Sequence, residues 1–188
     1  SNFSNNSEYA PNIKLDPNPI IIELGVFRGD FSKMLLDKYN PSEMYLVDPW
    51  VVGSDISTSR EYSFGKTAYS TSSDLNIVQN RFDKYDNVNI IKKYSYEAIP
   101  TFTDGYFDMV YIDACHLYEC VIRDIEISVP KIKKNGYLCG HDYINIKGAL
   151  YEKTILISNS FTSILCFCSG RNPLFSAGSK LHHSCKTG

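Results

Sequence analysis

The sequence lacks features that mark several large classes of proteins. No apolar run reaches the length of about 18 residues that a membrane-spanning helix needs, so we expect no contact with a membrane. Basic residues are not in excess, because 19 lysines and arginines stand against 21 acidic residues and the net charge is -2. Nucleic-acid-binding proteins normally present a basic face. The charge balance therefore predicts no nucleic-acid partner.

Cysteine is absent from the first 114 residues, and no two of the six cysteines form a CxxC pair. A disulfide framework normally spreads its bridges along the chain, and zinc ribbons and fingers need paired cysteines. We therefore expect reduced thiols and a cytoplasmic location. The polar, Asn-rich residues 1–18 do not resemble a signal peptide.

The composition is that of a globular protein, with 43% hydrophobic and 21% charged residues. A chain of 188 residues suits one domain. We predict a flexible leader over residues 1–18, a folded domain over 19–168, and a tail over 169–188 without a family-like pattern. Residues 51–73 are rich in Ser, Thr, Gly and Tyr, and a loop this long inside a domain is usually functional or disordered.

Apolar runs alternate with helical patterns from residue 20 to residue 143. We expect strands at 20–22, 44–47, 88–91, 107–112 and 137–139. Helices are expected after Asp30, after caps at 72–74 and over 118–129, with a short turn or helix at 95–99. Lys133 to Gly136 is interpreted as a helix stop. The alternation predicts an α/β fold, a doubly wound and mostly parallel sheet between two helical layers.

Four of the predicted strands end in an acidic residue: Glu23, Asp48, Asp113 and Asp142. Parallel α/β sheets bind ligands at the carboxyl ends of their strands. Gly25 and Gly29 follow the first strand with GxxxG spacing, not the GxGxxG of dinucleotide-binding loops. An acid at the end of the second strand can accept both hydroxyls of a ribose. Together these features predict a nucleoside-binding site, whereas a simple tight turn and a solvated Asp48 are the alternative.

Asp113 and Asp142 end two strands that we expect to be neighbours, and His116 and His141 lie close to them in the sequence. Oxygen and imidazole ligands converging on one point suit Mg²⁺, Ca²⁺ or Mn²⁺. The alternative is that one acid orients a ligand amine while the other caps a loop. The pattern therefore makes these residues candidates for a divalent-metal site.

His116 has two interpretations: a general base beside a carboxylate, or a histidine that orders the neighbouring loop. A zinc site formed by Cys115, His116, Cys139 and His141 is disfavoured, because adjacent strand residues face opposite sides. Trp50 likewise either stacks on a ligand base or fills the space beneath its loop.

Several of these segments resemble a known family. Residues 22–29, IELGVFRG, look like motif I of class I S-adenosylmethionine-dependent methyltransferases, and VDPW at 47–50 looks like their acidic second-strand motif. The stretch 107–143, with its IDxxHxYE and GHDY motifs, is similar to the subgroup of macrocin O-methyltransferases and cephalosporin-hydroxylase-like proteins. The resemblance implies a Rossmann-like fold with S-adenosylmethionine as cofactor.

The resemblance also implies a role for each motif residue. Glu23, Gly25 and Gly29 would line the methionine end and the turn of the cofactor loop. Asp48 would hold the ribose hydroxyls, Ser95 would lie near the adenine, and Asp113 would border the cofactor. Members that use a metal hold it at the positions of Asp113, His141 and Asp142, and for this chain we expect Mg²⁺. That metal would bind the substrate hydroxyl and lower its pKa before in-line attack on the methyl group.

The chain departs from the resemblance at two acids and at its C-terminal part. Cys115 and His141 stand where many relatives have acids, and we hypothesise that His116 replaces the lost base, so His116 and Asp113 are the catalytic candidates. A full sheet has two further strands on an antiparallel edge, for which 154–157 and 163–167 are candidates. The C-terminal edge is expected to be divergent or shortened, in which case a partner subunit, as in a homo-oligomer, would complete the substrate side.

The leading hypothesis is an O-methyltransferase acting on a hydroxyl of a small molecule, with a sugar as one candidate. The first alternative is a protein that binds S-adenosylmethionine without catalysing a reaction, because its metal acids are altered. The second alternative is a nucleotide-dependent oxidoreductase on the same architecture, which the GxxxG spacing disfavours.

Overall fold

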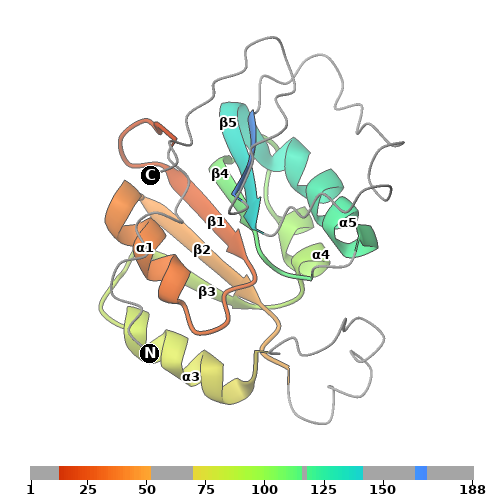
Figure 1. The fold of residues 1–188 in the computed structure, drawn as a ribbon. Helices are drawn as coiled ribbons and strands as arrows, with labels where there is room; N and C mark the ends of the chain where they lie inside the picture. The colour runs from red at the N-terminus through yellow and green to blue at the C-terminus, as the bar shows by residue number, and fades with distance from the viewer. Residues whose placement is uncertain (1–12, 52–69, 116–117, 142–163, 169–188) are drawn as a thin grey trace, which may run out of the picture.

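The computed structural model describes residues 13–51, 70–115, 118–141 and 164–168, and six strands of this part form one sheet (Figure 1). The strand order is β3-β2-β1-β4-β5-β6, and every neighbouring pair is parallel. The strands are β1 Ile20–Leu24, β2 Glu43–Asp48, β3 Val88–Lys92, β4 Phe107–Ile112, β5 Ile132–His141 and β6 Ile164–Cys168. The helices are α1 Asp30–Tyr39, α3 Ser72–Phe82, α4 Ser95–Ala98 and α5 Tyr118–Ser128, with 3₁₀ turns at Ile99–Thr101 and Val129–Lys131.

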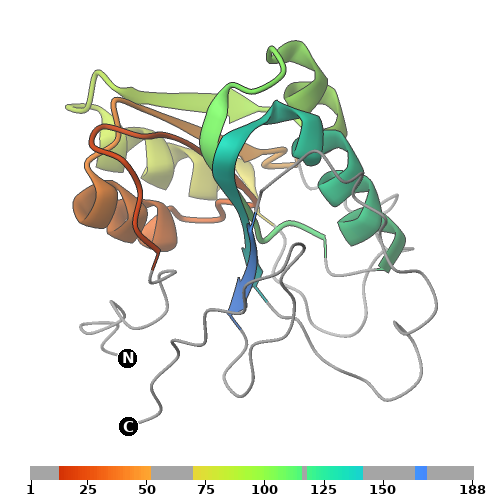
Figure 2. The same ribbon diagram turned by 90° about the horizontal axis from the view of Figure 1, so that it is seen from above.

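The helices cover both faces of the sheet, so the predicted three-layer α/β fold is confirmed (Figure 2). One hydrophobic cluster joins the sheet to α1 and α3 and includes Leu35 and Val78. The other joins it to α4 and α5 and includes Ala98 and Ile125. Successive residues of β1 enter opposite clusters, since Ile21 belongs to the first and Ile22 to the second. This alternation follows from the period of two in an extended strand.

The ends of the helices follow local chemistry. Asn40 adopts a left-handed conformation at the end of α1, and its amide donates to Leu36 O at 3.0 Å. Asp30 was expected to cap α1, but Gly29 occupies the N-cap position and Asp30 is the first helical residue. For α3, Thr71 is the N-cap and forms a capping box with Asp74, one residue before the predicted caps.

The predicted helix stop at Lys133 to Gly136 is wrong, because these residues open strand β5. The α-helix ends at Ser128 and a 3₁₀ turn contains Pro130, which has no amide to continue the helical ladder. A register shift between β4 and β5 falls in the same region. A Cβ on Gly136 would lie 2.6 Å from Ile132 Cγ2. The glycine therefore permits close strand packing rather than ending a helix.

The strand expected over 163–167 is present as β6, but its direction corrects the expectation. It pairs with β5 in parallel, with Tyr137 opposite Ile164, and does not form an antiparallel edge. A parallel neighbour needs a crossover of a dozen or more residues, and residues 142–163 provide that length. The candidate strand at 154–157 lies outside the described residues.

Packing begins ahead of the predicted domain boundary at residue 19. Ile13 and Leu15, inside the expected leader, pack against the cluster beneath α1 and α3. The hydroxyl of Tyr137 donates to the carbonyl of Lys14 at 3.3 Å. Residues 1–12 of the leader and the tail at 169–188 lie outside the described residues. No helix in the described part of the chain combines the length and apolarity that crossing a membrane requires.

The carboxyl ends of β1 and β4 meet at Gly25. This residue has φ +89°, and a Cβ built on it would lie 2.1 Å from the carbonyl oxygen of Asp113. The amide of Asp113 donates to Leu24 O at 2.7 Å, and the amide of Gly25 donates to Val47 O at 2.9 Å. A side chain at position 25 would therefore separate the strand ends that carry the acidic residues.

Replacing Gly25 with alanine is expected to cost more stability than the same change at Gly105. Gly105 also has a positive φ, of 65°, but a Cβ there would meet nothing within 4 Å. We expect Gly105→Ala to lower the free energy of unfolding by about 1 kcal/mol from backbone conformation alone. Gly25→Ala adds the clash with Asp113 and should cost about 3 kcal/mol in total. Urea unfolding measures both variants, and equal losses would contradict this account of the strand ends.

Candidate active site

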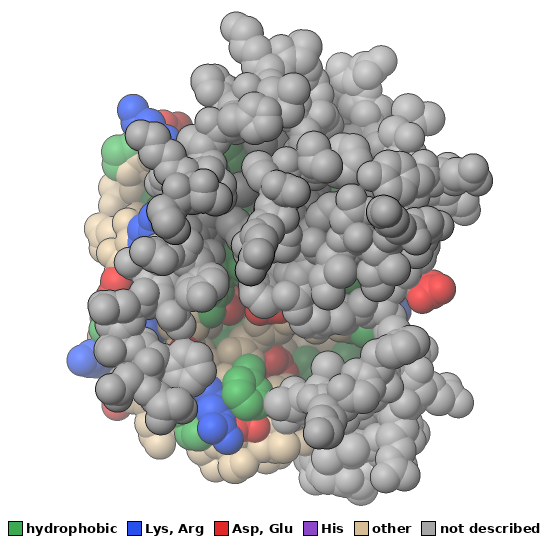
Figure 3. All heavy atoms as spheres, viewed as in Figure 1, with side chains coloured by type: hydrophobic (Ala, Val, Ile, Leu, Met, Phe, Trp, Pro, Cys, Tyr) green, Lys and Arg blue, Asp and Glu red, His purple; other side chains and the backbone are tan. Residues whose placement is uncertain are grey.

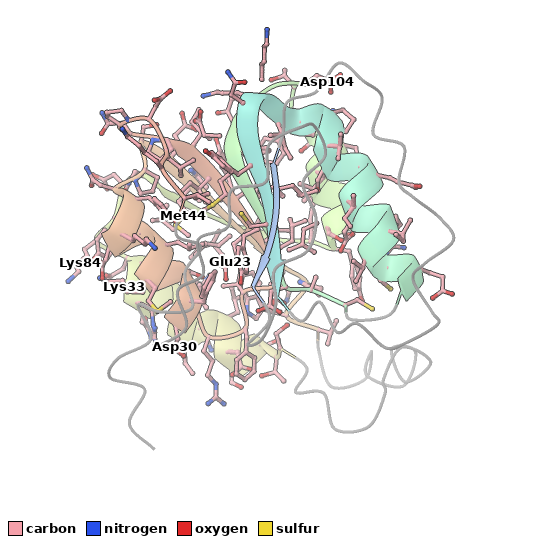
Figure 4. All side chains as sticks on the ribbon, turned by 45° about the horizontal axis from the view of Figure 1, so that its top comes forward. Glu23, Asp30, Lys33, Met44, Lys84 and Asp104 are labelled. Atoms are coloured by element: carbon pink, nitrogen blue, oxygen red, sulfur yellow. The ribbon has the colours of Figure 1, made fainter. Side chains whose placement is uncertain are left out.

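Of the acids that the structure describes at the carboxyl edge of the sheet, Glu23 is the most deeply buried. Its exposed fraction is 1%, and it lies on the side of β1 that faces α1 (Figure 4). The hydroxyl of Ser32, in the first turns of α1, donates to Glu23 Oε2 at 2.5 Å. In the same view the labelled Asp30, Lys33, Lys84 and Asp104 lie towards the outside of the molecule. Glu23 is thus held inside the fold by a neutral donor.

Burial raises the pKa of Glu23 well above the ordinary glutamate value, and the nearby negative charges of Asp113 and Asp48 raise it further. The hydrogen bond from Ser32 acts in the opposite direction but does not cancel the effect of burial. Within the described part of the chain, neither Glu23 nor Asp48 forms an ion pair with a lysine or arginine. The adjoining strand ends therefore bring the carboxyl groups of Glu23 and Asp48 together without a described basic partner, with Asp113 close to Glu23.

Asp48 at the end of β2 holds the loop that follows β1. Its Oδ2 accepts hydrogen bonds from the amides of Val26 at 2.9 Å and Phe27 at 3.0 Å. Its Oδ1 accepts from the amide of Trp50 at 3.0 Å and from the hydroxyl of Ser70. A carboxylate offers about four acceptor positions, so these four donors use the capacity of Asp48. A ribose hydroxyl would have to replace one of them.

The loop over residues 25–29 has an unusual backbone conformation. Gly25 and Gly29 have positive φ, and so does Phe27, with φ 54°. Trp50, also with positive φ, is fully buried, and its indole Nε1 donates to Phe27 O at 2.9 Å. Trp50 therefore packs under the loop, which is the second of its two interpretations. Asp48 and Trp50 together impose a conformation that a phenylalanine seldom adopts.

Gly29 has a packing role in addition to its place in the predicted cofactor loop. A Cβ at this position would lie 2.8 Å from the Phe82 ring of α3. Its amide donates to Val26 O at 2.9 Å, which closes the turn that leads into α1. The glycine therefore allows α3 to approach the start of α1 closely.

Ser95, expected near the adenine, lies at the start of α4 beyond the carboxyl end of β3. Its hydroxyl donates to Asp124 Oδ1 at 2.6 Å and so ties α4 to α5. Burial raises the pKa of Asp124, whereas Ser95 and the charge of Arg123 lower it. The position fits the expected edge of the sheet, but the hydroxyl already has a partner. The adenine role of Ser95 stays a prediction.

The proposed metal and base residues are only partly within the described structure. Asp113 is half-buried at the end of β4, next to β5 in the sheet. His116, Asp142 and the side chain of His141 lie outside the described residues. Among the residues that the structure does describe, no three His, Cys, Asp or Glu side chains are grouped to hold a metal ion. Cys139 is fully buried in the core, which fits a packing role and not a zinc ligand.

Sequence reasoning missed several residues that shape this site. Ser32 and the pair Arg28–Asp74 were not singled out, nor were the hydrogen bonds that Asp48 accepts from the loop after β1. The ribose role of Asp48 stays a prediction. One signal was available: Thr71 and Asp74 have the spacing of a capping box, which marks Asp74 as a buried acid at a helix start. The partner of Glu23 depends on tertiary packing, so no local pattern indicates it.

The sheet order and the helical layers define a Rossmann-like α/β domain, and comparisons with known proteins agree with this fold. A family model described as a methyltransferase domain matches residues 22–143, which is more than half of the chain. The chain belongs to this methyltransferase-domain family. The match runs from the third residue of β1 to just beyond the end of β5 and includes the strand-end residues Glu23, Asp48 and Asp113.

Among curated proteins, an uncharacterised protein of Acanthamoeba polyphaga mimivirus is 22% identical over 127 residues, 65% of this chain. The chain spans about half the length of that relative, of which 50% is covered.

Among solved structures, phosphoethanolamine N-methyltransferase 1 of Haemonchus contortus, in complex with phosphoethanolamine and S-adenosylhomocysteine, is similar in fold. The TM-score is 0.51 at 14% identity, over 71% of this chain and 24% of that one. A SAM-dependent methyltransferase of Archaeoglobus fulgidus has a TM-score of 0.44 at 19% identity, over 64% of this chain and 42% of that one.

The buried carboxyl group of Glu23 is expected to make stability depend on pH. Its pKa in the folded protein lies above the ordinary value of 4.5, so ionisation above that pH opposes folding. Glu23→Gln keeps an acceptor for Ser32 and removes the charge. The variant should melt at a higher temperature than the wild type at pH 8, and the difference should shrink as the pH falls towards 4.5.

Glu43 supplies a control of opposite sign, because the hydroxyls of Tyr45 and Tyr106 lower its pKa. Ionised Glu43 contributes stability above pH 4.5 that is lost on acidification. Glu43→Gln should therefore lower the melting temperature at neutral pH. A Glu23→Gln protein that melts below the wild type at pH 8 would mean that the folded site stabilises the ionised carboxylate.

Proposed function

We propose that the chain binds S-adenosylmethionine at the carboxyl edge of β1, β2 and β4 and transfers its methyl group. The observation that carries the proposal is the acid cluster around the strained loop at 25–29, in which Glu23 and Asp48 are buried and Asp113 is half-buried. Such a cluster favours a cationic ligand, because neighbouring carboxylates lower the free energy of a positive charge placed among them. Membership of the methyltransferase-domain family supports the same ligand.

The chemistry of the donor set fits this cofactor. The bound cofactor would supply a methyl group on a positively charged sulfur, together with an ammonium group. Glu23, once ionised, is suited to accept hydrogen bonds from the ammonium, while Ser32 holds its other side. Asp48 accepts the ribose hydroxyls in this proposal, with the Ser70 hydroxyl giving up its place on Oδ1. The amides of Val26 and Phe27 keep the carboxylate oriented during the exchange.

For the acceptor we propose a hydroxyl group of a small molecule, with a sugar as one candidate. Its activation would use a divalent metal such as Mg²⁺ at Asp113, His141 and Asp142, with His116 as base. The resemblance to the metal-using subgroup supports this part, as does the parallel pairing of β4 and β5, which brings the residues after both strands to one edge.

If a metal activates the acceptor, EDTA should reduce methyl transfer without weakening the binding of the cofactor. Methyl transfer that resists EDTA would remove the metal from the proposal.

Two variants of the Asp48 site give a direct binding test by calorimetry with S-adenosylhomocysteine. Asp48→Asn places an amide among backbone donors and should weaken binding by about tenfold or more, the equivalent of ~1.4 kcal/mol. Ser70→Ala removes a donor that competes with the ribose, so its affinity should equal or exceed that of the wild type. Equal weakening by both variants would contradict the exchange at Asp48.

Titration with NAD separates the enzyme classes. Binding of S-adenosylhomocysteine and not NAD supports a methyltransferase, and the reverse supports the nucleotide-dependent oxidoreductase. Binding of S-adenosylhomocysteine by a protein that methylates no hydroxyl acceptor, with or without Mg²⁺, would favour the non-catalytic alternative.

A further inference from the structure

Arg28 is fixed in place although more than half of its side chain is exposed. Its Nε donates to Asp74 Oδ1 at 2.7 Å, and the exposed fractions of the two side chains are 53% and 5%. The other oxygen of Asp74 accepts from the amide and the hydroxyl of Thr71, at 2.9 Å and 2.7 Å. The buried carboxylate is thus shared between the start of α3 and the loop after β1.

The guanidinium group also lies over an aromatic ring. Arg28 Cζ is 5.0 Å from the centre of the Phe27 ring, within the range of a cation–π contact. Phe27 is 38% exposed, whereas its amide and carbonyl are held by Asp48 and Trp50. The backbone is therefore constrained at a conformational cost while a large apolar side chain remains at the surface. Constraints of this kind are typical of functional sites.

The pairing of Arg28 uses Nε and none of its terminal nitrogens, as far as the described residues are concerned. An arginine that serves only a structural ion pair commonly forms two parallel bonds to both oxygens of its partner. Here Thr71 occupies the second oxygen of Asp74, and within the described part of the chain neither Nη atom of Arg28 has a hydrogen-bond or ion-pair partner. The planar fork formed by these atoms matches a carboxylate or phosphate group.

Two features place this fork beside the candidate active site. Arg28 follows Phe27, whose amide binds Asp48, and precedes the N-cap Gly29 of α1. Gly29 has no side chain to accept from the first amides of the ten-residue helix, so the positive end of α1 lies at the same loop. In the space-filling view, basic, acidic and hydrophobic side chains lie next to one another near the lower edge of the face shown (Figure 3).

We propose that Arg28 binds the anionic group of a ligand, a carboxylate or a phosphate, beside this site. The proposal rests on the proposed function for the identity of the site but not for the chemistry of Arg28. The anion has two possible sources, the carboxylate of the cofactor's amino-acid part or an anionic group on the acceptor. Asp74 and the Phe27 ring position the guanidinium for either one.

The first arm of the experiment compares S-adenosylmethionine with its decarboxylated form by calorimetry, because the two differ only in the carboxylate. If the cofactor supplies the anion, the wild type should prefer S-adenosylmethionine by about tenfold, the equivalent of ~1.4 kcal/mol. Arg28→Gln should abolish this preference without changing the affinity for the decarboxylated form. Arg28→Lys, which keeps the charge but not the fork, should retain only part of it.

The second arm uses inorganic phosphate as a probe for an acceptor anion. The titration is run on the protein saturated with S-adenosylhomocysteine and on the unloaded protein. If the acceptor supplies the anion, the wild type should bind phosphate, and Arg28→Gln should weaken that binding about tenfold (~1.4 kcal/mol). In that case the wild type would show no preference for S-adenosylmethionine over its decarboxylated form, or Arg28→Gln would leave that preference unchanged.

Arg81→Gln is the matched control. Arg81 pairs with Asp30 at 2.6 Å and lies about two turns further along α3 than Asp74, so its loss also removes an ion pair between α3 and the start of α1. Arg81→Gln should change neither the cofactor preference nor the affinity for phosphate, and thermal melting confirms that all variants fold.

If Arg28→Gln matches Arg81→Gln in both arms, the proposal is overturned and Arg28 is only a structural partner of Asp74. A wild type that binds neither form of the cofactor refutes the proposed function, while phosphate binding to the unloaded protein still decides the role of Arg28.

Discussion

The carboxylate of Asp48 is the contact on which the arrangement of this site depends. It ends β2, yet its hydrogen bonds reach the loop after β1, the turn at Trp50 and the hydroxyl of Ser70. Backbone amides bound to a carboxylate are among the stronger hydrogen bonds in proteins. They hold Phe27 in a left-handed conformation and set the direction in which Arg28 and α1 leave the sheet.

The site combines features that oppose stability with a fold that compensates for them. A buried glutamate with a raised pKa, nearby carboxylates and a constrained loop are all unfavourable in the absence of a ligand. The parallel sheet and its two hydrophobic clusters supply the stability that permits them. A cationic ligand would relieve the repulsion among the carboxylates, and in our proposal Arg28 receives an anionic group beside them.

Much of the fold follows from the sequence, because strands buried on both faces are continuous apolar runs and the acids mark where they end. Strand β4 has the predicted bounds, and Glu23, Asp48 and Asp113 lie at one edge as expected. The start of β5 was mistaken for a helix stop, because the glycine after the lysines instead allows β5 to lie close to β4: a Cβ on Gly136 would be 3.0 Å from Asp108 O. Ser32 reaches Glu23 from the next helix, and Arg28 reaches Asp74 across 46 residues. These contacts depend on how the elements pack, and no local pattern specifies them. The roles of His116, His141 and Asp142 stay predictions.

The central claim is that S-adenosylmethionine binds at the ends of β1, β2 and β4. The most direct measurement is the change in backbone amide NMR signals when S-adenosylhomocysteine is added. The account predicts large shifts at Val26, Phe27 and Trp50, whose amides all bind Asp48, and little change at Gly105, which precedes β4 at the opposite edge. Saturable binding that leaves the Val26 and Phe27 signals unchanged would contradict it.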